Sequence, residues 1–409
     1  MQPLHSTLIA GFLAALAAPL AAQLALPQLP AVPPVGGTVD AIAARAGNLT
    51  RASLDDVGAA LRQARTARID DLLRRNRQTI ERDADGQPAR RGTLLVLDPG
   101  EADRARLAAL GFTLRGSERL DDLSMTVVEL TVPAGLDLAA AQRLVAKTLP
   151  GLTVSSDPLH FQSGGAASLA AAEVGAGQGA ITTPIGLIDG APAQQVDALR
   201  GFAAGAPLPS NHGSAVVSLA TRAGVRTIRV ADVYGNDPAG GNALAIVRGM
   251  NWLIAGGARV ISISLVGPRN PVLERAVGAA RARQVLVVAA VGNDGPAAPP
   301  SYPASYGGVV AVTAVDRRNR PLIEAGRALH LDYAAPGADI TARNAAGRLV
   351  AVRGTSYAVP LVAARAAAAF QRGVAFSQIG AALDAEARPL ARKLPDPRSG
   401  RGLLCDGCR

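Results

Sequence analysis

The sequence predicts an α/β protein: a three-layer, doubly wound, mostly parallel sheet, preceded by a small α+β unit. The strands expected after residue 181 are apolar throughout, which is typical of parallel strands buried on both faces. They alternate with helical patterns, as a sheet covered by helices on each side requires. An earlier stretch, residues 93–155, alternates strand and helix in a shorter unit of its own. The main sheet is expected from residues 185–188, 227–233, 260–265, 285–290 and 309–315, and its helices from residues 214–221, 241–255 and 271–283.

Composition narrows the class of protein. The chain has 409 residues, of which 49% are hydrophobic and only 3% aromatic, so its core must consist mainly of Ala, Val, Leu and Ile. The formal net charge of +10 comes almost entirely from arginine, because the lysines are Lys147 and Lys393 alone. The sequence contains no basic run with interleaved aromatic residues, so we expect no nucleic-acid partner.

The N-terminal stretch is expected to direct export. Residues 7–22 form an apolar run that ends in small residues and is short for a membrane span. We predict a signal peptide at residues 1–22, cleaved near Ala22, and no stable membrane insertion; an uncleaved anchor is the alternative. Residues 23–92 are expected to be a Pro-rich and helical region, with helical spacing from 39 to 83 and a linker at 83–92.

Residues 93–160 are predicted to fold as a unit of their own. Strands are expected at residues 94–97, 112–114, 125–130 and 152–154, with helices at 101–110 and 136–149. This β-α-β-β-α-β order is that of a ferredoxin-like split unit, a fold that fixes no function by itself. Residues 161–180 follow as a Gly/Ala-rich linker, expected to be flexible and accessible to proteases.

A serine lies at the start of a predicted helix. Residues 354–360, with the sequence GTSYAVP, place Ser356 directly before an alanine-rich run that extends to residue 370. We expect Pro360 in the first turn, where its missing N–H has no cost. Free backbone N–H groups and the helix dipole then favour negative charge beside Ser356, as an acyl-transfer nucleophile requires.

Three further polar residues lie at strand ends or helix starts. Asp189 directly follows the strand at 185–188, His212 precedes a small-residue helix, and Asn293 follows the strand at 285–290. Catalytic groups of such sheets collect at the carboxyl ends of the strands. Each residue alone is typical of a turn or a cap. Together, in the order Asp, His, Asn, Ser and each in a matching context, they predict a catalytic site.

Residues 181–388 resemble the catalytic domain of the subtilisin-like serine proteases, the subtilase family. The matching motifs are GLIDG (186–190), NHGSAV (211–216), ISISLVGP (261–268), VVAAVGNDG (287–295), YPASY (302–306), VAVTAVD (310–316), APG (335–337) and GTSYAVP (354–360). The resemblance implies a subtilisin-like fold for residues 181–390 and an endopeptidase that works through an acyl-enzyme. It implies that Ser356 is the nucleophile, His212 the general base, Asp189 the orienting carboxylate and Asn293 an oxyanion donor.

The resemblance also implies where a substrate binds. Ser264, Leu265, Val266 and Gly267 resemble the family's substrate-binding segment, to which an extended peptide adds as a strand. Val266 stands where glycine is usual, so it should narrow the cleft. Gly190 and Ala191 also depart from the usual residues after the aspartate. The sequence has no Asp-rich calcium loop, and we expect neither a metal nor a cofactor.

The resemblance gives residues 93–160 a role as well. Subtilase prodomains have the same small fold, and they assist folding and inhibit the enzyme through a C-terminal tail in the cleft. We therefore expect a zymogen that acts on polypeptides, is secreted or periplasmic, and carries its prodomain as an intramolecular inhibitor and chaperone. The alternative role for this unit is a permanent accessory domain.

The C-terminal tail, residues 391–409, contains Cys405 and Cys408. We favour a disulfide or a free tail over half of a metal site or a redox pair, because a single CxxC is weak evidence for zinc. Other functions for the whole protein are a catalytically weak or inactive binding or scaffold protein, a serine esterase, and a protease acting mainly on itself.

Overall fold

The computed structural model describes residues 51–167 and 179–409. The predicted signal peptide, the Pro-rich stretch and most of the Gly/Ala-rich linker lie outside the described residues. No helix in the described ranges is long and apolar enough to cross a membrane.

Helix α2 (Arg51–Arg75) opens the described chain and confirms the helical spacing expected before residue 83. The linker expected at residues 83–92 is wrong, because β1 (Ile80–Arg82) and β2 (Pro88–Leu97) form an antiparallel hairpin there. The Asp83 carboxylate closes its turn by accepting the N–H groups of Asp85 and Gln87, at 3.0 and 2.8 Å. The polar residues that suggested a linker are therefore turn and edge residues of a hairpin.

The N-terminal unit, which we define as β1 to β5, is an antiparallel sheet with two helices. Its strand order is β1-β2-β4-β3, with β5 paired to β2. The elements expected from the sequence are present, although β3 is longer than expected. They are α3 (Glu101–Ala109), β3 (Thr113–Leu120), the 3-10 turn η2 (Asp121–Leu123), β4 (Met125–Thr131), α4 (Leu138–Thr148) and β5 (Val154–Pro158).

Strand β2 is buried on both faces of this small sheet, which explains why it is apolar at consecutive positions. On β2, Leu94 and Val96 pack in a cluster with residues of α3 and α4, such as Leu107 and Leu138. Leu95, between them, points to the other face and belongs to the hydrophobic cluster of α6 and α7. Alternate residues of one strand thus join two different cores, because successive side chains of a strand point to opposite faces.

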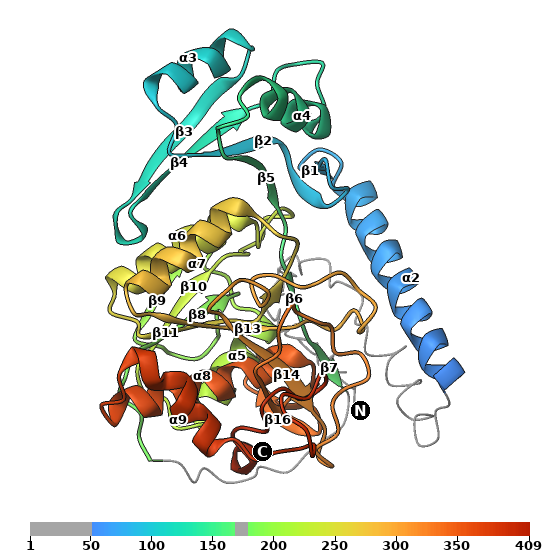
Figure 1. Cartoon of the computed structure of the whole chain (residues 1–409), viewed down its shortest axis with the longest axis vertical. Coiled ribbons are helices and arrows are strands. Elements are labelled where there is room, and N and C mark those ends of the chain that lie inside the picture. Colours follow the sequence, from blue (N-terminus) through green and yellow to red (C-terminus); the bar gives the residue numbers. More distant parts are fainter. Residues whose placement is uncertain (1–50, 168–178) are drawn as a thin grey trace, which may run out of the picture. The chain divides into compact units, whose positions relative to one another are not determined.

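The C-terminal α/β domain, residues 181–409, is built on a seven-stranded sheet of order β15-β14-β13-β11-β8-β10-β9 in which every paired neighbour is parallel. Helices α6 and α7 cover one face and α5 and α8 the other (Figure 1). The strands are β8 (Ile185–Asp189), β9 (Ala198–Gly201), β10 (Ile228–Asp232), β11 (Val260–Ile263), β13 (Leu286–Ala290), β14 (Val310–Val315) and β15 (Tyr333–Pro336). The helices are α5 (Asn211–Arg222), α6 (Ala243–Ala255), α7 (Pro271–Ala282) and α8 (Thr355–Gln371).

Two small sheets join the N-terminal unit to this domain. Strand β6 (Phe161–Gln162) pairs antiparallel with β12 (Leu265–Val266). Strand β7 (Gly165–Ala167) pairs antiparallel with β17 (Leu349–Arg353), which also pairs with β16 (Ile340–Arg343). We call residues 160–167 the cleft segment, because they leave the N-terminal unit and run along the α/β domain as a strand.

The C-terminal part of the chain closes one edge of the large sheet. After η3 (Phe376–Gln378) and α9 (Ile379–Glu386), Leu403 forms a parallel bridge with Ala334 of β15 and an antiparallel bridge with Arg388. The turn η4 (Asp406–Cys408) follows, and Cys405 and Cys408 form a disulfide, one of the two possibilities that the sequence favoured.

Candidate active site

Asp189 is the last residue of β8 and is almost completely buried. The N–H of Gly190 donates to its Oδ1 at 2.7 Å. Both carboxylate oxygens also lie within hydrogen-bond distance of His212 Nδ1, at 2.9 and 2.8 Å. A buried carboxylate needs such partners, because an isolated charge in a protein interior is expensive. The aspartate predicted at a strand end therefore orients the predicted histidine.

His212 is the second residue of α5, which Ser210 caps by accepting the N–H of Gly213 at 3.0 Å. A side chain at Gly213 is excluded, because a Cβ there would lie 2.0 Å from the carbonyl oxygen of Gly190. The two glycines bring the helix start against the end of β8. With Nδ1 donating to Asp189, the other ring nitrogen, Nε2, is left as the acceptor; it is buried and has no hydrogen-bond partner among the described residues.

Ser356 is the second residue of α8 and is fully buried in this structure. Pro360 lies inside the helix rather than in its first turn, so the sequence expectation was wrong. In a regular helix the N–H of residue 360 would donate to the carbonyl of Ser356, and proline cannot. The hydroxyl of Ser264 donates to that carbonyl instead, at 2.9 Å. Ser264, in the predicted substrate-binding segment, thus supplies the hydrogen bond that the proline removes.

Asn293 follows β13 in a glycine-flanked loop, and its side chain is held in one orientation. Its Oδ1 accepts the N–H of Thr355 at 3.0 Å, which leaves Nδ2 to donate into the cleft. The hydroxyl of Thr355 in turn accepts the N–H of Gly292 at 3.1 Å. The start of α8 therefore fixes both the serine and the amide that was predicted as an oxyanion donor.

The cleft segment contacts both Ser356 and Asn293. The carbonyl oxygen of Ser163 accepts the N–H of Ser356 at 3.0 Å and Asn293 Nδ2 at 2.5 Å. The N–H of Ser163 donates to the carbonyl of Ser264 at 3.2 Å. Gln162 pairs with Leu265, and Phe161 with Val266, in the β6–β12 ladder. Ser264, Leu265 and Val266 therefore bind an extended strand, while Gly267 exchanges backbone hydrogen bonds with Tyr302 at 2.9 and 3.0 Å.

Four residues at this site could not be recognised from the sequence. Ser163 places its hydroxyl 2.7 Å from Ser356 Oγ, and Gln162 Nε2 donates to Asp189 Oδ1 at 3.1 Å. Gly164 lies against the ring of Tyr357, which is also 5.4 Å from the imidazole of His212, centroid to centroid. Burial, reinforced by the nearby Asp189 charge, raises the pKa of the Tyr357 phenol, which keeps it neutral. No local pattern marks Gln162, Ser163 or Gly164, because their partners lie far along the chain.

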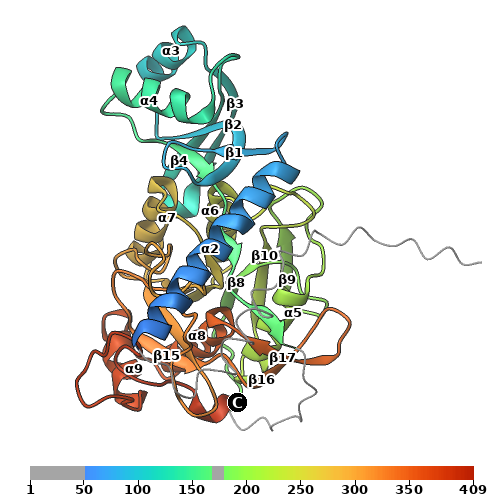
Figure 2. The same cartoon turned by 90° about the vertical axis from the view of Figure 1, so that its right-hand side faces the viewer.

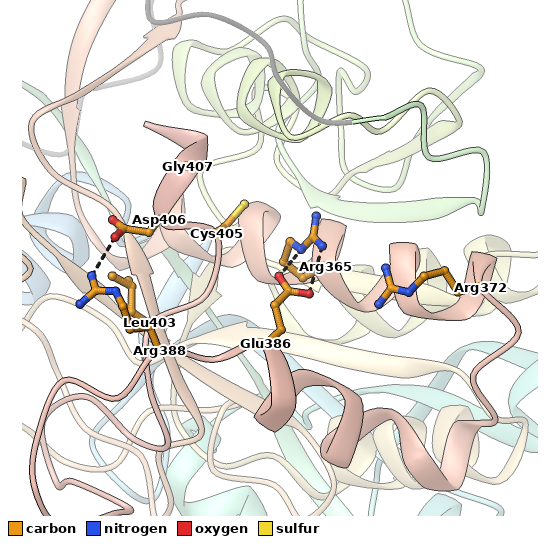
Figure 3. Close-up of a pocket in the computed structure, with 8 residues that line it drawn as sticks. All are labelled: Arg365, Arg372, Glu386, Arg388, Leu403, Cys405, Asp406 and Gly407. Carbon is orange, nitrogen blue, oxygen red and sulfur yellow. Dashed lines mark hydrogen bonds and ion pairs between the residues drawn. The ribbon is translucent and has the colours of Figure 1, made fainter.

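A second hollow lies away from these residues (Figure 3). Its arginines are largely neutralised by carboxylates of the same hollow, because Arg365 pairs with Glu386 and Arg388 with Asp406. None of the candidate catalytic residues lines it. Its lining residues are Arg365, Arg372, Glu386, Arg388, Leu403, Cys405, Asp406 and Gly407. Among the described residues no group of three or more His, Cys, Asp or Glu side chains could hold a metal ion.

The fold and this constellation define a class of protein. A doubly wound parallel sheet carries Asp, His and Ser side chains, in that chain order, at strand ends and helix starts, with two N–H donors beside the serine. That chain order separates the class from the α/β-hydrolases and from the chymotrypsin-like proteins.

Comparison with known proteins finds a family match for part of the chain. Residues 203–382, which are less than half of the chain, match the family model described as "Subtilase family". Over 170 residues the chain is 34% identical to Subtilisin Savinase of Lederbergia lenta, covering 41% of this chain and 61% of that protein. It is 31% identical over 170 residues to the Minor extracellular protease Epr of Bacillus subtilis (strain 168), covering 41% of this chain and 26% of that protein. The match therefore spans less than two thirds of either relative.

A solved structure supports the fold alone. Fervidolysin from Fervidobacterium pennivorans, described as a keratinolytic enzyme related to subtilisin, superposes with a TM-score of 0.66 at 17% sequence identity. The superposition covers 79% of this chain and 61% of that one. The subtilisin-like α/β fold, preceded by an antiparallel α+β unit, is thus the fold of this chain.

Proposed function

We propose that this protein is a serine endopeptidase made as a precursor, and that its first substrate is its own Ser163–Gly164 peptide bond. The observation that carries the proposal is the position of the Ser163 carbonyl oxygen, which accepts both Ser356 N–H and Asn293 Nδ2. A carbonyl bound by two such donors is polarised toward attack, and the donors are already in place for the negative charge that develops on the oxygen.

The proposed chemistry uses four residues in separate roles. Ser356 Oγ forms a bond to the carbonyl carbon of Ser163 while His212 Nε2 takes the hydroxyl proton. Asp189 holds the Nδ1–H of the imidazolium, and Asn293 with the Ser356 N–H holds the oxyanion. The C–N bond to Gly164 then breaks, His212 returns the proton to the departing amine, and water hydrolyses the acyl-enzyme. In this structure Ser356 Oγ is hydrogen-bonded to the Ser163 hydroxyl, so the Ser356 side chain must rotate toward His212 before attack.

The N-terminal unit would serve as an inhibitor because its cleft segment occupies the substrate position on both sides of the bond. Strand β6 pairs before the bond and β7 after it, so a polypeptide in trans would have to displace both. Main-chain pairing of this kind accepts many sequences, which fits polypeptides as substrates.

The same unit would assist folding through the starts of two helices. Its buried Asp157 accepts the N–H of Leu244 in the first turn of α6 at 3.0 Å, where a carboxylate stabilises the helix dipole. Asn270, the cap of α7, donates to Ser155 Oγ and to the carbonyl of Ser156, each at 3.1 Å. Two helices on one face of the parallel sheet are therefore anchored by β5.

A secreted or periplasmic location is part of the proposal. The name of the relative Epr calls that protein extracellular. The Cys405–Cys408 disulfide also fits an oxidising compartment, where such bonds persist.

Intact mass and N-terminal sequencing of the purified full chain test the proposal. We expect the wild type to yield a fragment beginning at Gly164, and Ser356→Ala to stay whole at that bond. Ser377→Ala, a substitution of an exposed serine in η3, is the matched control and should cleave like the wild type. A wild type that remains uncut, or a Ser356→Ala chain that is cut equally fast, would contradict the proposal.

A further inference from the structure

Gly164 lies directly against the aromatic ring of Tyr357. A Cβ at Gly164 would lie 2.7 Å from Tyr357 Cε2, 3.0 Å from Cζ and 3.2 Å from the hydroxyl oxygen. Carbon atoms that are not bonded to each other pack at about 3.5–4.0 Å, so the smallest side chain already overlaps the ring.

The need for glycine at this position is spatial. Gly164 does not lie in the left-handed region, which side chains disfavour, so its backbone conformation is open to other residues. What excludes them is the ring. Position 164 therefore differs from turn positions such as Gly292, with φ +88, where the backbone conformation itself favours glycine.

The ring of Tyr357 has little freedom to move aside. It is buried in the main core cluster, with 3% of its surface exposed. It also contacts the imidazole of His212, with ring centroids 5.4 Å apart and ring planes at 42°. A side chain at position 164 would displace a ring that contacts the histidine, and that histidine must reach Ser356 Oγ, so the displacement would disturb the reacting groups.

The Gly354 backbone is equally close to Gly164. A Cβ at Gly354 would lie 2.7 Å from the Cα of Gly164, 2.8 Å from the Ser163 carbonyl oxygen and 2.8 Å from Asn293 Nδ2. The backbone at Gly164 thus has two close neighbours, the Tyr357 ring and the Gly354 backbone, which together leave it little room to shift.

We infer that Tyr357 makes glycine the required residue on the leaving side of the cleaved bond. The inference rests on the proposed function and names its substrate class: extended polypeptide segments cut immediately before a glycine, as in glycine-rich chains. Tyr357 acts as a specificity-determining residue because it contacts the substrate residue that departs.

The first test measures self-cleavage of the full chain in Gly164→Ala. We expect cleavage at the bond between residues 163 and 164 to slow by about 100-fold, since a displacement near 1 Å at reacting groups has that effect. Cleavage that moves to the bond before Gly165 also supports the inference. Gly151→Ala is the matched control, because no atom lies within 4 Å of a Cβ at that position. The inference would be overturned if Gly164→Ala were cleaved between residues 163 and 164 at a rate within about tenfold of the wild-type rate.

The second test asks whether the ring is the cause. The factor by which Gly164→Ala slows cleavage is measured in three backgrounds: the wild type, Tyr357→Phe and Tyr357→Ala. We expect Tyr357→Phe to keep this factor and Tyr357→Ala to lower it at least tenfold; Tyr357→Met replaces Tyr357→Ala if that chain does not fold. An unchanged factor without the ring would overturn the inference. A wild type that never cleaves contradicts the proposed function instead, which keeps the two failures apart.

Discussion

Two segments of the N-terminal half reach the same loop of the α/β domain, and they hold adjacent residues by different forces. The cleft segment binds Asn293 through the Ser163 carbonyl, within a run of backbone hydrogen bonds. Helix α2, which runs along the α/β domain (Figure 2), binds the next residue, Asp294, through Arg65 at 3.3 Å and Arg68 at 2.7 Å. Leu61 of the same helix is buried where a side chain at Gly295 would otherwise sit.

The two contacts differ in their relation to the proposed reaction. The reaction changes the Ser163 carbonyl that binds Asn293, but it leaves the contact between α2 and Asp294 unchanged. Cleavage after Ser163 would convert the carbonyl that binds Asn293 into a carboxylate and cut the link between β6 and β7, whereas the charges and the leucine of α2 take no part in the reaction. Partly exposed ion pairs contribute little stability each, typically about 0.2–1 kcal/mol. The backbone pairing of the cleft segment, by contrast, is tied to the reacting carbonyl. Three experiments break the contacts one at a time.

The largest effect is expected from Asn293→Ala, which removes a donor to the Ser163 carbonyl but leaves Asp294 in place. Self-cleavage should slow by about 10²–10³-fold, the range already measured for such a donor in subtilisin. A time course of fragment formation by mass spectrometry measures it. Asn251→Ala on α6 is the control. If the rate of self-cleavage falls by less than about tenfold, Asn293 stabilises its loop and does not act as an oxyanion donor.

A smaller effect is expected at His160, the first residue of the cleft segment. Its ring is fully buried against Gly267, neither ring nitrogen has a partner among the described residues, and burial lowers its pKa from 6.5 to about 4. The bound segment therefore holds a neutral imidazole, whereas a released segment takes up a proton below pH 6.5. Docking should be strongest above pH 6.5 and weaken as the pH falls toward 4, by at most about tenfold per pH unit.

The dissociation constant of the cleaved N-terminal fragment, measured between pH 7 and pH 4.5, tests this dependence. His160→Phe should flatten the profile, and His330→Gln should not. Asp157 titrates in the same complex, with its pKa raised by burial, so the difference between wild type and His160→Phe isolates the histidine. Identical profiles for the two chains would assign the pH dependence elsewhere.

The smallest effect is expected from removing both arginines that hold Asp294. The double variant Arg65→Ala/Arg68→Ala should weaken the docking of α2 by about 1 kcal/mol, and leave self-cleavage within a few-fold of wild type. Hydrogen exchange of the α2 amides measures docking. Arg74→Ala/Arg75→Ala is the control, because those arginines pair with Asp71 of the same helix. A large loss of self-cleavage would contradict this expectation, because it would mean that α2 positions the loop that carries Asn293.

The parts of the site that the sequence predicted are those with a local signature. Asp189, His212, Asn293 and Ser356 each lie in a strand-end or helix-start motif, so their places followed from the order of elements, and the fold class followed from the buried strands. Their proposed roles stay predictions until the variants are measured.

The parts that the sequence did not predict depend on distant partners. Ser163 meets Ser356 across 193 residues, and nothing near residue 163 indicates it. The hairpin at residues 80–97 was missed because its turn is held by a side chain, Asp83. Pro360 was misplaced because its compensating donor, Ser264, lies far away in the sequence, between β11 and β12.

Residues 402–404, near the C-terminus, cover an edge of the large sheet that could otherwise pair with another chain. A parallel sheet ends in strands whose outer N–H and C=O groups can template another chain. At β15 the N–H of Ala334 donates to the carbonyl of Gly402 at 2.9 Å, and the N–H of Leu404 donates to the carbonyl of Ala334 at 2.8 Å. Arg388 then exchanges backbone hydrogen bonds with Leu403 on the outer side, at 2.9 and 2.8 Å. Residues 402–404 therefore occupy the outer backbone groups of Ala334, which blocks that part of the sheet edge from pairing with another chain.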